Sequence, residues 1–402
     1  MSRLPIKIAY GAIAVALAGV SLIASAGNSL RARSPEVAAT LPGETQARVA
    51  SFNKLQGSGK KVPAKAAAAA AKDALRSNPL DSPALRLLMD ATADPAGKLE
   101  LAELAGRVSK RDGRIRLVLF EDAAAHNRPK QVLQNLDALL RVTPESQTQV
   151  FPMLGGVLPS EDFRAHLSPY LVKRSPWMLD FVLFAANDGK SAGHIADVVI
   201  RSGKSVDPRD AAYIVPHLIS RTIEAGEYSK VRPLVSMMTK SPDDLLAARR
   251  WSNDSTDGKY GLAAWQTVSN ATTSASFTNR NEEGYRGLSV YASSGARGIA
   301  ASKFLQLKPG SYELVQEAEV AEMARAPSAQ WQLRCISSGK SETIWTTDNF
   351  LSADRRKIKY LFTVPAGCPQ QMLELNVAVD FEAPPVELTI DDFRLRRVSA
   401  AT

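Results

Sequence analysis

A chain of 402 residues is too long for one ordinary hydrophobic core, so two folded domains are the default expectation. Its composition, 45% hydrophobic and 23% charged, is that of a globular protein and argues against large-scale disorder. The net charge of +9 is concentrated in residues 1–65, which hold nine basic and two acidic residues. A nucleic-acid footprint would place the excess on a folded face or helix, so we exclude nucleic acid as a partner.

The amino terminus has the features of a membrane-insertion signal. Arg3 and Lys7 precede an uncharged run, 8–26, which ends in Ala-Ser-Ala. The run is long enough to cross a bilayer and longer than the apolar part of most cleaved signals. We therefore predict a signal-anchor, a transmembrane helix within 1–27, and leave cleavage after Ala26 as the alternative. The protein would then be a single-pass inner-membrane protein with its body in the periplasm.

The next segment, 28–62, is rich in Pro, Gly, Ser, Thr and Lys and lacks sustained apolar periodicity. We predict a basic, flexible tether there. Its charge and its place beside the apolar run favour anionic lipid or a wall polymer over nucleic acid as a neighbour.

Residues 63–250 predict a series of helices separated by short polar turns. Proline or aspartate recurs at nearly equal steps, at Pro79, Asp112, Pro144, Pro176, Pro208 and Pro242. A near-constant period of this length is typical of stacked helix pairs. Such a solenoid has an extended surface suited to a protein partner, because each repeat buries its apolar stripe only on its neighbours.

One unit shows the pattern best: a helix containing Ile115, a turn at 126–129, and a second helix with an apolar stripe that includes Leu133 and Leu136. The period, the Gly-Glu-Tyr turn at 226–228 and the terminal prolines resemble a tetratricopeptide-repeat array. The Trp-Leu-Gly-Tyr signature of that family is absent, and an irregular α-solenoid is the alternative. Three prolines are expected to interrupt helices, Pro152, Pro216 and Pro233.

From about residue 257 to 400 the pattern changes to short strands, which predict an antiparallel β-sandwich. The predicted strands are 287–292, 304–307, 312–319, 331–336, 359–364, 372–379 and 386–398, the last with an interruption. Turn signals such as Pro309-Gly310 separate them.

Two motifs narrow this expectation, Leu-Lys-Pro-Gly-Ser-Tyr at 307–312 and Ile-Asp-Asp-Phe-Arg-Leu at 390–395. They resemble strands of the galactose-binding-like jelly roll that many carbohydrate-binding modules share. The resemblance covers about 258–399 and specifies fold better than ligand. The fold class is thus expected to be multi-domain, α then β.

The two cysteines, Cys335 and Cys368, both lie in the predicted sandwich. They are consistent with one disulfide in an oxidising compartment, and two buried free thiols are the alternative. In a jelly roll the disulfide would tie two strand regions together.

Sugar binding needs aromatic faces and planar polar groups. We single out Trp345, because polar residues surround it, together with Tyr285, Tyr291 and Trp265. Aromatic residues of a sandwich more often belong to its core or rim, which is the alternative for each of them.

A structural calcium is a second candidate site. Related sandwiches often hold one with acidic residues of the first and last strands, which suggests Glu317 with Asp391 or Asp392. A solvated acidic strand end is the alternative. No other cofactor is expected.

No catalytic site is expected. Three Gly-Lys-Ser triplets, at 189–191, 203–205 and 339–341, lack the earlier glycine and the strand–helix setting of a phosphate-binding loop. The four histidines lie far apart in the chain, and no two of them have metal-ligand spacing. Gly-x-Ser-x-Gly and His-Glu-x-x-His are also absent.

The combination resembles accessory proteins of bacterial envelope-polysaccharide or exopolysaccharide assembly. It implies a non-catalytic scaffold that binds a protein through its helical repeats, glycan through its sandwich and the membrane through 8–26. Two alternatives stay open: a polysaccharide hydrolase or lyase, and a purely protein-binding assembly factor.

Overall fold

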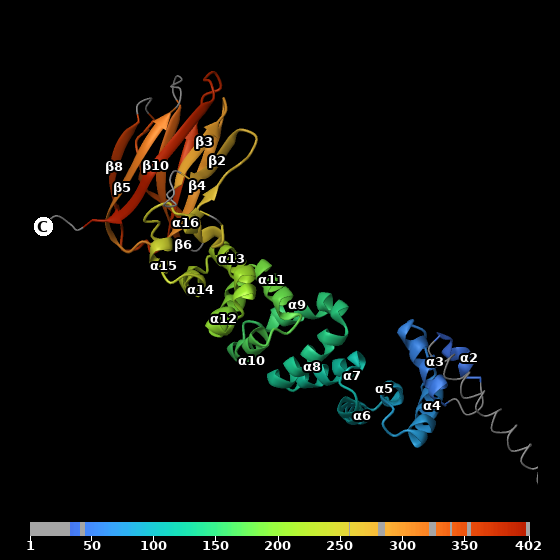
Figure 1. Ribbon diagram of the computed structural model, residues 1–402. Helices are drawn as coiled ribbons and strands as arrows, with labels where there is room; N and C mark the ends of the chain where they lie inside the picture. The colour runs from blue at the N-terminus through green and yellow to red at the C-terminus, as the bar shows by residue number, and fades with distance from the viewer. Residues whose placement is uncertain are drawn as a thin grey trace, which may run out of the picture. The chain divides into compact units, whose positions relative to one another are not determined.

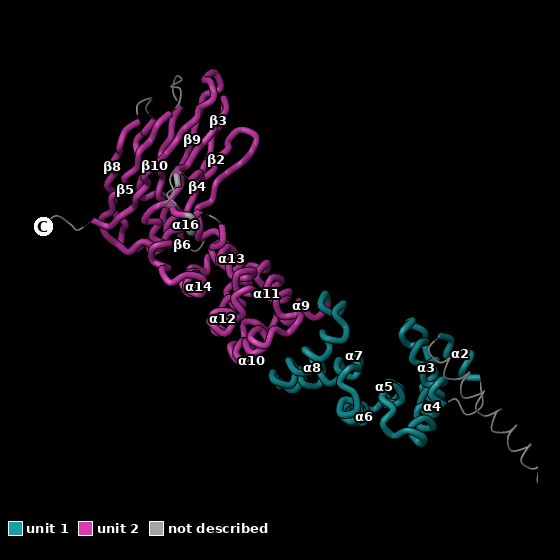
Figure 2. The backbone as a smooth tube through the Cα atoms, in the orientation of Figure 1, with its two compact units in different colours: residues 1–148 teal, residues 149–402 magenta. Residues whose placement is uncertain are grey.

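The computed structural model describes residues 33–40, 45–256, 258–279, 286–320, 327–337, 340–351 and 355–398. Helices occupy the amino-terminal part and strands the carboxyl-terminal part, as expected for α followed by β (Figure 1). The chain divides into two compact units, residues 1–148 and 149–402 (Figure 2).

The first unit is helical. Its described elements are α2 (Pro35–Ala38), α3 (Thr45–Gly57), α4 (Ala64–Ser77), α5 (Ser82–Ala91), α6 (Pro95–Val108), α7 (Gly113–Ala125), α8 (Pro129–Val142) and the 3-10 turn η1 (Pro144–Ser146). Three helices begin at an aspartate whose carboxylate accepts hydrogen bonds from first-turn N–H groups: Asp81, Asp94 and Asp112. The helix pair predicted at 113–142 is confirmed: it consists of α7 and α8, in which Ile115, Leu133 and Leu136 are buried.

The sequence predicts a flexible tether over 28–62, and here the structure differs. Much of this segment is helical, in α2 and α3. The reason is packing: Val49 of α3 is buried against Ala67, Ala71 and Ala74 of α4. Phe52 of α3 is half-buried against the same cluster, and two large apolar residues are too few to give α3 a sustained apolar periodicity in the sequence.

The second unit begins inside helix α9 (Gln147–Val157). The helices that follow are α10 (Glu161–Val172), α11 (Met178–Asn187), α12 (Ala192–Ser202), α13 (Pro208–Glu224), α14 (Val231–Met238), α15 (Pro242–Leu246) and α16 (Asn253–Thr256). Short 3-10 turns lie at η2 (Gly203–Ser205), η3 (Tyr228–Lys230) and η4 (Gly261–Ala263). Two prolines expected to interrupt helices do not: α9 continues through Pro152 and α13 through Pro216. Pro233 lies in the first turn of α14, where its missing N–H is tolerated.

The rest of this unit is a β-sandwich. Its strands are β1 (Gln266–Thr267), β2 (Thr273–Asn279), β3 (Arg286–Ala292), β4 (Arg297–Leu305), β5 (Gly310–Val320), β6 (Ser328–Ser337), β7 (Lys340–Thr346), β8 (Arg356–Val364), β9 (Gln371–Ala378) and β10 (Val386–Arg397). They form two antiparallel sheets, which we call the first sheet, in the order β1-β4-β9-β6-β7, and the second sheet, in the order β2-β3-β10-β5-β8. Each of the seven predicted strands overlaps an observed one, and the expected interruption of the last is a shift of register between Asp391 and Arg394.

Helices and sandwich of the second unit share main-chain contacts. The segment after α15 runs beside β10, where the carbonyl of Arg249 accepts a hydrogen bond of 3.0 Å from the N–H of Leu395. It then places the Trp251 ring in the sandwich core, stacked 4.8 Å from Phe393. At α13, a β-carbon on Gly261 would collide with the carbonyl of Pro216, and the φ of +53° at Gly261 also favours glycine.

The sandwich core is unusually aromatic. One cluster contains the rings of Trp251, Trp265, Trp331, Phe277 and Phe393, and the centroids of the rings in contact are 4.8 to 6.2 Å apart. These rings come from both sheets and from the linking segment, so the cluster fixes the two sheets and that segment together.

The first sheet of the sandwich also contains a fully buried lysine. Lys303 of β4 stands opposite Leu373 in the register, is fully buried, and donates a hydrogen bond to the carbonyl of Ala263 in η4. Burial disfavours the charged ammonium and lowers the pKa of Lys303 from 10.5 to about 7.

This burial predicts a pH-dependent stability. Between pH 7 and 10.5 the unfolded chain carries a proton on Lys303 that the folded chain lacks, so raising the pH stabilises the fold. We expect wild type to gain about 2 kcal/mol relative to Lys303→Met between pH 7.5 and 9, measured by urea unfolding. Lys308→Met, at an exposed position, is the control. A constant difference between wild type and Lys303→Met across this range would contradict the expectation.

The predicted inner-membrane, single-pass location is corrected. In the part of the chain that the structure describes, no helix has the length and apolar character needed to span a bilayer. The segment behind that prediction, 8–26 within 1–27, lies outside the described residues.

Candidate functional site

The outer side of the first sheet carries a group of planar polar side chains. Along β6, Ala329, Trp331 and Leu333 point into the core and are buried, whereas the alternate residues Gln330 and Gln332 are half-buried. Because successive strand residues face opposite sides, both amides lie on the outer face. Arg334, the next alternate residue, extends this row.

The neighbouring strand β9 completes the group. Its register places Asn376 opposite Gln330 and Glu374 opposite Gln332. The amide of Asn376 donates a hydrogen bond of 3.2 Å to Gln332, and Arg334 forms an ion pair of 2.6 Å with Glu374.

Strands at the two sides add further groups. From β7, the Thr343 hydroxyl accepts a hydrogen bond of 2.6 Å from Gln332. From β4, Ile299 stands opposite Asn376 and is 36% exposed. We call the set the polar face: Ile299, Gln330, Gln332, Arg334, Thr343, Glu374 and Asn376.

The polar face suits the recognition of neutral hydroxyl groups. The amides and the Arg334 guanidinium offer donors and acceptors in fixed directions, because the side chains hold one another in place, and the buried carboxylate of Glu374 anchors Arg334. Gln330 has no protein hydrogen bond among the described residues, so its amide is free to contact a ligand. Ile299 supplies apolar contact at one end.

The predicted aromatic platforms do not converge on this face. Trp265 is 3% exposed, and its ring is enclosed by Trp251, Trp331 and Phe393, so a sugar could not reach it in the folded protein. Tyr285 lies outside the described residues.

The other two predicted aromatic platforms, Tyr291 and Trp345, lie away from the polar face. Tyr291 is 43% exposed on the outer side of the second sheet, opposite Glu387 of β10. Trp345 lies on β7 and is half-buried where the edges of the two sheets meet, with its ring 4.7 Å from Phe362 and 6.1 Å from Tyr360. Burial also raises the pKa of Tyr360. The ring of Trp345 therefore closes this edge of the core.

The most exposed aromatic side chain among the described residues lies in a loop, where no motif of the sequence marks it as a candidate. Phe381, in the loop between β9 and β10, is 86% exposed. Its ring lies on Gly295, where any β-carbon would collide with it. Gly295 lies just before the start of β4. The other end of β4, at Leu305, is the one near the helices, because the next residue, Gln306, donates a hydrogen bond to the carbonyl of Tyr228 in η3. Phe381 therefore lies at the end of the strands remote from these helices.

The predicted calcium ligands are close together but already paired. Glu317 and Asp391 are opposite one another in the register, and the Arg355 guanidinium bonds to both, at 2.9 and 3.4 Å. Asp392 pairs with Arg394 and Lys357. The hydrogen bond with Glu317 raises the pKa of Arg355. A calcium ion would have to displace these cations, and among the described residues no cluster of three metal-ligating side chains is found.

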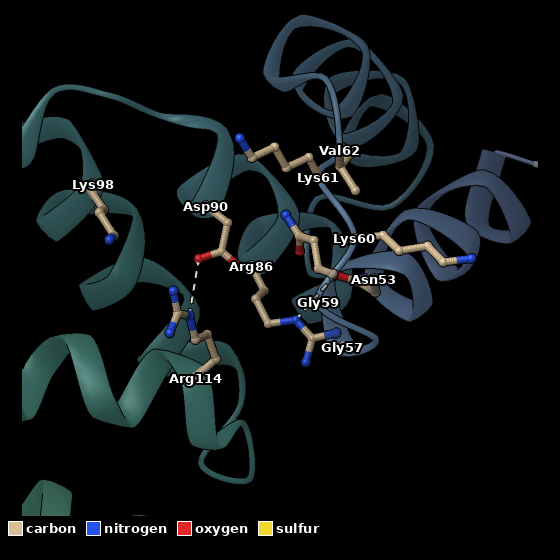
Figure 3. Close-up of a pocket in the computed structure, with 11 residues that line it drawn as sticks. Asn53, Gly57, Gly59, Lys60, Lys61, Val62, Arg86, Asp90, Lys98 and Arg114 are labelled. Atoms are coloured by element: carbon tan, nitrogen blue, oxygen red, sulfur yellow. Dashed lines mark hydrogen bonds and ion pairs between the residues drawn. The ribbon is translucent and has the colours of Figure 1, made fainter.

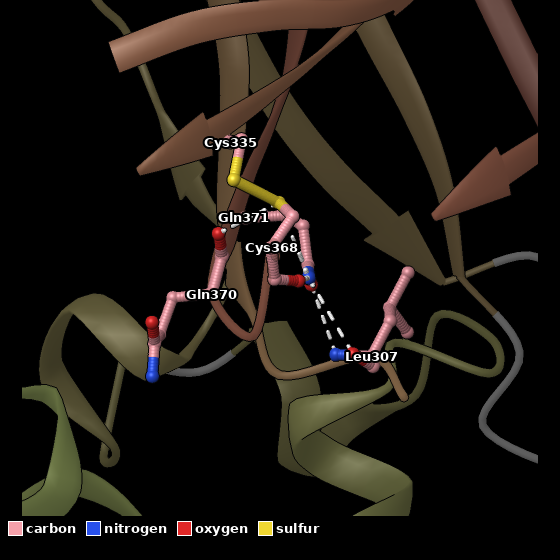
Figure 4. Close-up of a disulfide and its surroundings, with 5 residues drawn as sticks. All are labelled: Leu307, Cys335, Cys368, Gln370 and Gln371. Atoms are coloured by element: carbon pink, nitrogen blue, oxygen red, sulfur yellow. Dashed lines mark hydrogen bonds between the residues drawn. A yellow bond between two sulfur atoms is a disulfide. The ribbon is translucent and has the colours of Figure 1, made fainter. Parts of the chain in front are cut away.

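The predicted disulfide is confirmed: Cys335 at the end of β6 is bonded to Cys368, with Cα atoms 5.5 Å apart (Figure 4). Beside it, the buried amide of Gln371 bridges two loops. Its oxygen accepts from the Leu307 N–H at 2.9 Å, and its nitrogen donates to the Cys368 carbonyl. The disulfide fits an oxidising compartment such as the periplasm or the extracellular space.

A hollow of about 740 Å³ lies between α15, the segment after it and β10. Its arginines are largely neutralised: Arg249 pairs with Asp244, Arg394 with Asp392, and Arg396 with Glu313. With these charges already satisfied, the hollow offers less to a ligand than the polar face does.

No family model and no curated protein matches this chain. Solved structures similar to it include one titled "CBM4 structure and function", at 15% identity and a TM-score of 0.25, covering 34% of this chain and 97% of that one. The xylan-binding CBM22-1 domain of a Paenibacillus barcinonensis protein has 15% identity and a TM-score of 0.26, covering 34% and 87%. The amino-terminal cellulose-binding domain of Cellulomonas fimi β-1,4-glucanase C has 15% identity and a TM-score of 0.23, covering 33% and 93%. Likeness at this level does not establish a ligand.

Proposed function

We propose that the sandwich binds a polysaccharide chain across its polar face. The observation that carries this proposal is the group of mutually hydrogen-bonded amides, Gln332 and Asn376, beside the unpaired amide of Gln330. Neutral sugars present hydroxyls in fixed directions, and planar amides held in place on strands match them with little loss of side-chain entropy.

We further propose that the protein is a non-catalytic scaffold in envelope-polysaccharide or exopolysaccharide assembly or export. The tetratricopeptide-like helices would bind a partner protein, and exposed apolar side chains on the helices of the second unit support this: Met153, Phe184 and Tyr213 are 39 to 63% exposed. The disulfide favours a compartment outside the cytosol, where such polymers are assembled or exported.

The test is electrophoresis of the full chain in gels that contain xylan, mixed-linkage β-glucan or galactan. We expect retardation by at least one polymer, and a loss of affinity of about tenfold or more in the triple variant Gln330→Ala/Gln332→Ala/Asn376→Ala, since each hydrogen bond lost contributes about 1 kcal/mol.

The matched control truncates one row on the outer side of the second sheet, Ser276→Ala/Ser289→Ala/Thr389→Ala. It should leave affinity within about twofold. Equal losses in both triple variants would contradict the polar face as the site. Release of reducing ends or unsaturated sugars by the purified chain would instead favour a hydrolase or a lyase.

A further inference from the structure

A second surface stands out in the first unit, a hollow of about 570 Å³ within the range of ligand sites. We call it the basic hollow. Five cationic side chains and one carboxylate line it: Lys60, Lys61, Arg86, Lys98, Arg114 and Asp90. Figure 3 shows Lys98 of α6, the two arginines and the two lysines of the loop after α3, with the side chains of Lys60 and Lys61 pointing to opposite sides of that loop.

Most of this charge has no protein counterion. Arg114 pairs with Asp90 at 3.4 Å, and Arg86 is held by Asp112 and Asn53, each at 3.3 Å. In the described chain no carboxylate is within ion-pair distance of Lys60, Lys61 or Lys98. The two arginines are thus fixed in position, while three ammonium groups remain to neutralise a ligand.

The two helix ends beside the hollow do not add to this charge. Lys98 lies near the start of α6 and Arg114 near the start of α7, but the carboxylates of Asp94 and Asp112 already accept hydrogen bonds from the N–H groups at these two ends. The attraction for an anion therefore rests on the cationic side chains of the hollow.

The lining also limits the kind of anion. Of the described residues around the hollow none is aromatic, so nucleic-acid bases would find no ring on which to stack. Val62 is the single branched aliphatic side chain among those lining residues, which offers little for insertion into a membrane. The disulfide favours a compartment outside the cytosol, where polyanions include acidic polysaccharides.

We propose that the basic hollow is a second binding site, for the carboxylate or phosphate groups of an anionic polysaccharide. This site lies in the first unit and does not depend on glycan binding by the sandwich. A polymer bound here would place its charged groups among these lysines, with the arginines contacting them in fixed directions.

The test uses the full chain with four probes: polygalacturonate, a phosphodiester-linked teichoic acid, single-stranded DNA, and vesicles of phosphatidylcholine with phosphatidylserine. The variant is Lys60→Gln/Lys61→Gln/Lys98→Gln. The control removes equal charge from the same unit outside the hollow, Lys65→Gln/Lys72→Gln/Lys110→Gln, at three exposed positions. Affinity is measured at several salt concentrations by microscale thermophoresis, and by co-sedimentation for the vesicles.

We expect binding to polygalacturonate or to the teichoic acid. Comparison of the two affinities shows whether the hollow prefers carboxylate or phosphate groups. The hollow variant should lose at least tenfold in affinity, with a weaker salt dependence because fewer counterions are released. The control should stay within about threefold. Equal losses in both variants, tightest binding to DNA or vesicles, or no binding to either polysaccharide would each overturn the proposal. The Gln330→Ala/Gln332→Ala/Asn376→Ala variant should bind these probes like wild type, so failure of one site is distinguishable from failure of the other.

Discussion

Replacing Trp251 with alanine is expected to destabilise the second unit by about 4 kcal/mol. The Trp251 ring is 2% exposed and contacts Trp265, Phe277 and Phe393. Its loss would leave a cavity in the core and would release the segment that pairs with β10 through Arg249. The measurement is urea unfolding followed by circular dichroism in the β-sheet region.

Trp251→Phe is the matched control. The indole N–H of Trp251 is buried without a hydrogen-bond acceptor among the described residues, so a phenyl ring keeps most of the packing and removes an unsatisfied donor. We expect a loss below about 1.5 kcal/mol. Losses of similar size in both variants would mean that the aromatic cluster does not hold the linking segment in the core.

Removing the disulfide with Cys335→Ala/Cys368→Ala is expected to lower stability by about 3–4 kcal/mol. The bond spans 33 residues, and in the chain-entropy model a loop of this size restricts the unfolded chain by that amount. Urea unfolding of the oxidised wild type and the double variant measures the difference.

Reduction supplies the control for this prediction. Dithiothreitol should lower the stability of wild type toward that of the variant and leave the variant unchanged, because the variant has no bond to reduce. A wild type that is indifferent to reduction, with both thiols open to labelling after denaturation without reductant, would contradict a disulfide in the protein.

Much of the fold can be predicted from the sequence, where apolar residues recur with a clear period. β6 and β9 alternate and α8 has a stripe of leucines, so each could be recognised from its own residues. β2 and β7 were missed because Thr, Ser and charged residues dominate them, and their place depends on pairing with neighbouring strands. α3 was missed because only Val49 and the half-buried Phe52 carry its contact with the apolar cluster that includes the α4 alanines, and polar residues surround them in the sequence.

The candidate site was harder to predict. Gln332 and Asn376 are 44 residues apart, and only the register of β6 with β9 brings them together. The alternation of Gln330 and Gln332 with buried residues was a usable signal for an outward face on β6. Conversely, Trp265 looks like a sugar platform in sequence, because nothing local shows that four other rings enclose it.

The outcome at the predicted calcium site also depended on a contact that the local sequence does not reveal. The expected acidic residues do meet, since Glu317 is opposite Asp391. Arg355, which lies just before β8, bonds to both carboxylates, and its distance from them in the sequence gives no sign of this contact. An ion site depends on every charge in reach, and that set is known only once the sheet is assembled.

The most direct test of glycan binding at the polar face is isothermal titration calorimetry with oligosaccharides of the polymer that retards the chain. We predict a one-to-one isotherm for wild type, little change for Tyr291→Ala on the opposite sheet, and a dissociation constant at least tenfold weaker for Gln332→Ala/Asn376→Ala with an unchanged unfolding midpoint. Unchanged affinity in the Gln332→Ala/Asn376→Ala variant, or a loss of affinity in Tyr291→Ala alone, would contradict glycan binding at the polar face.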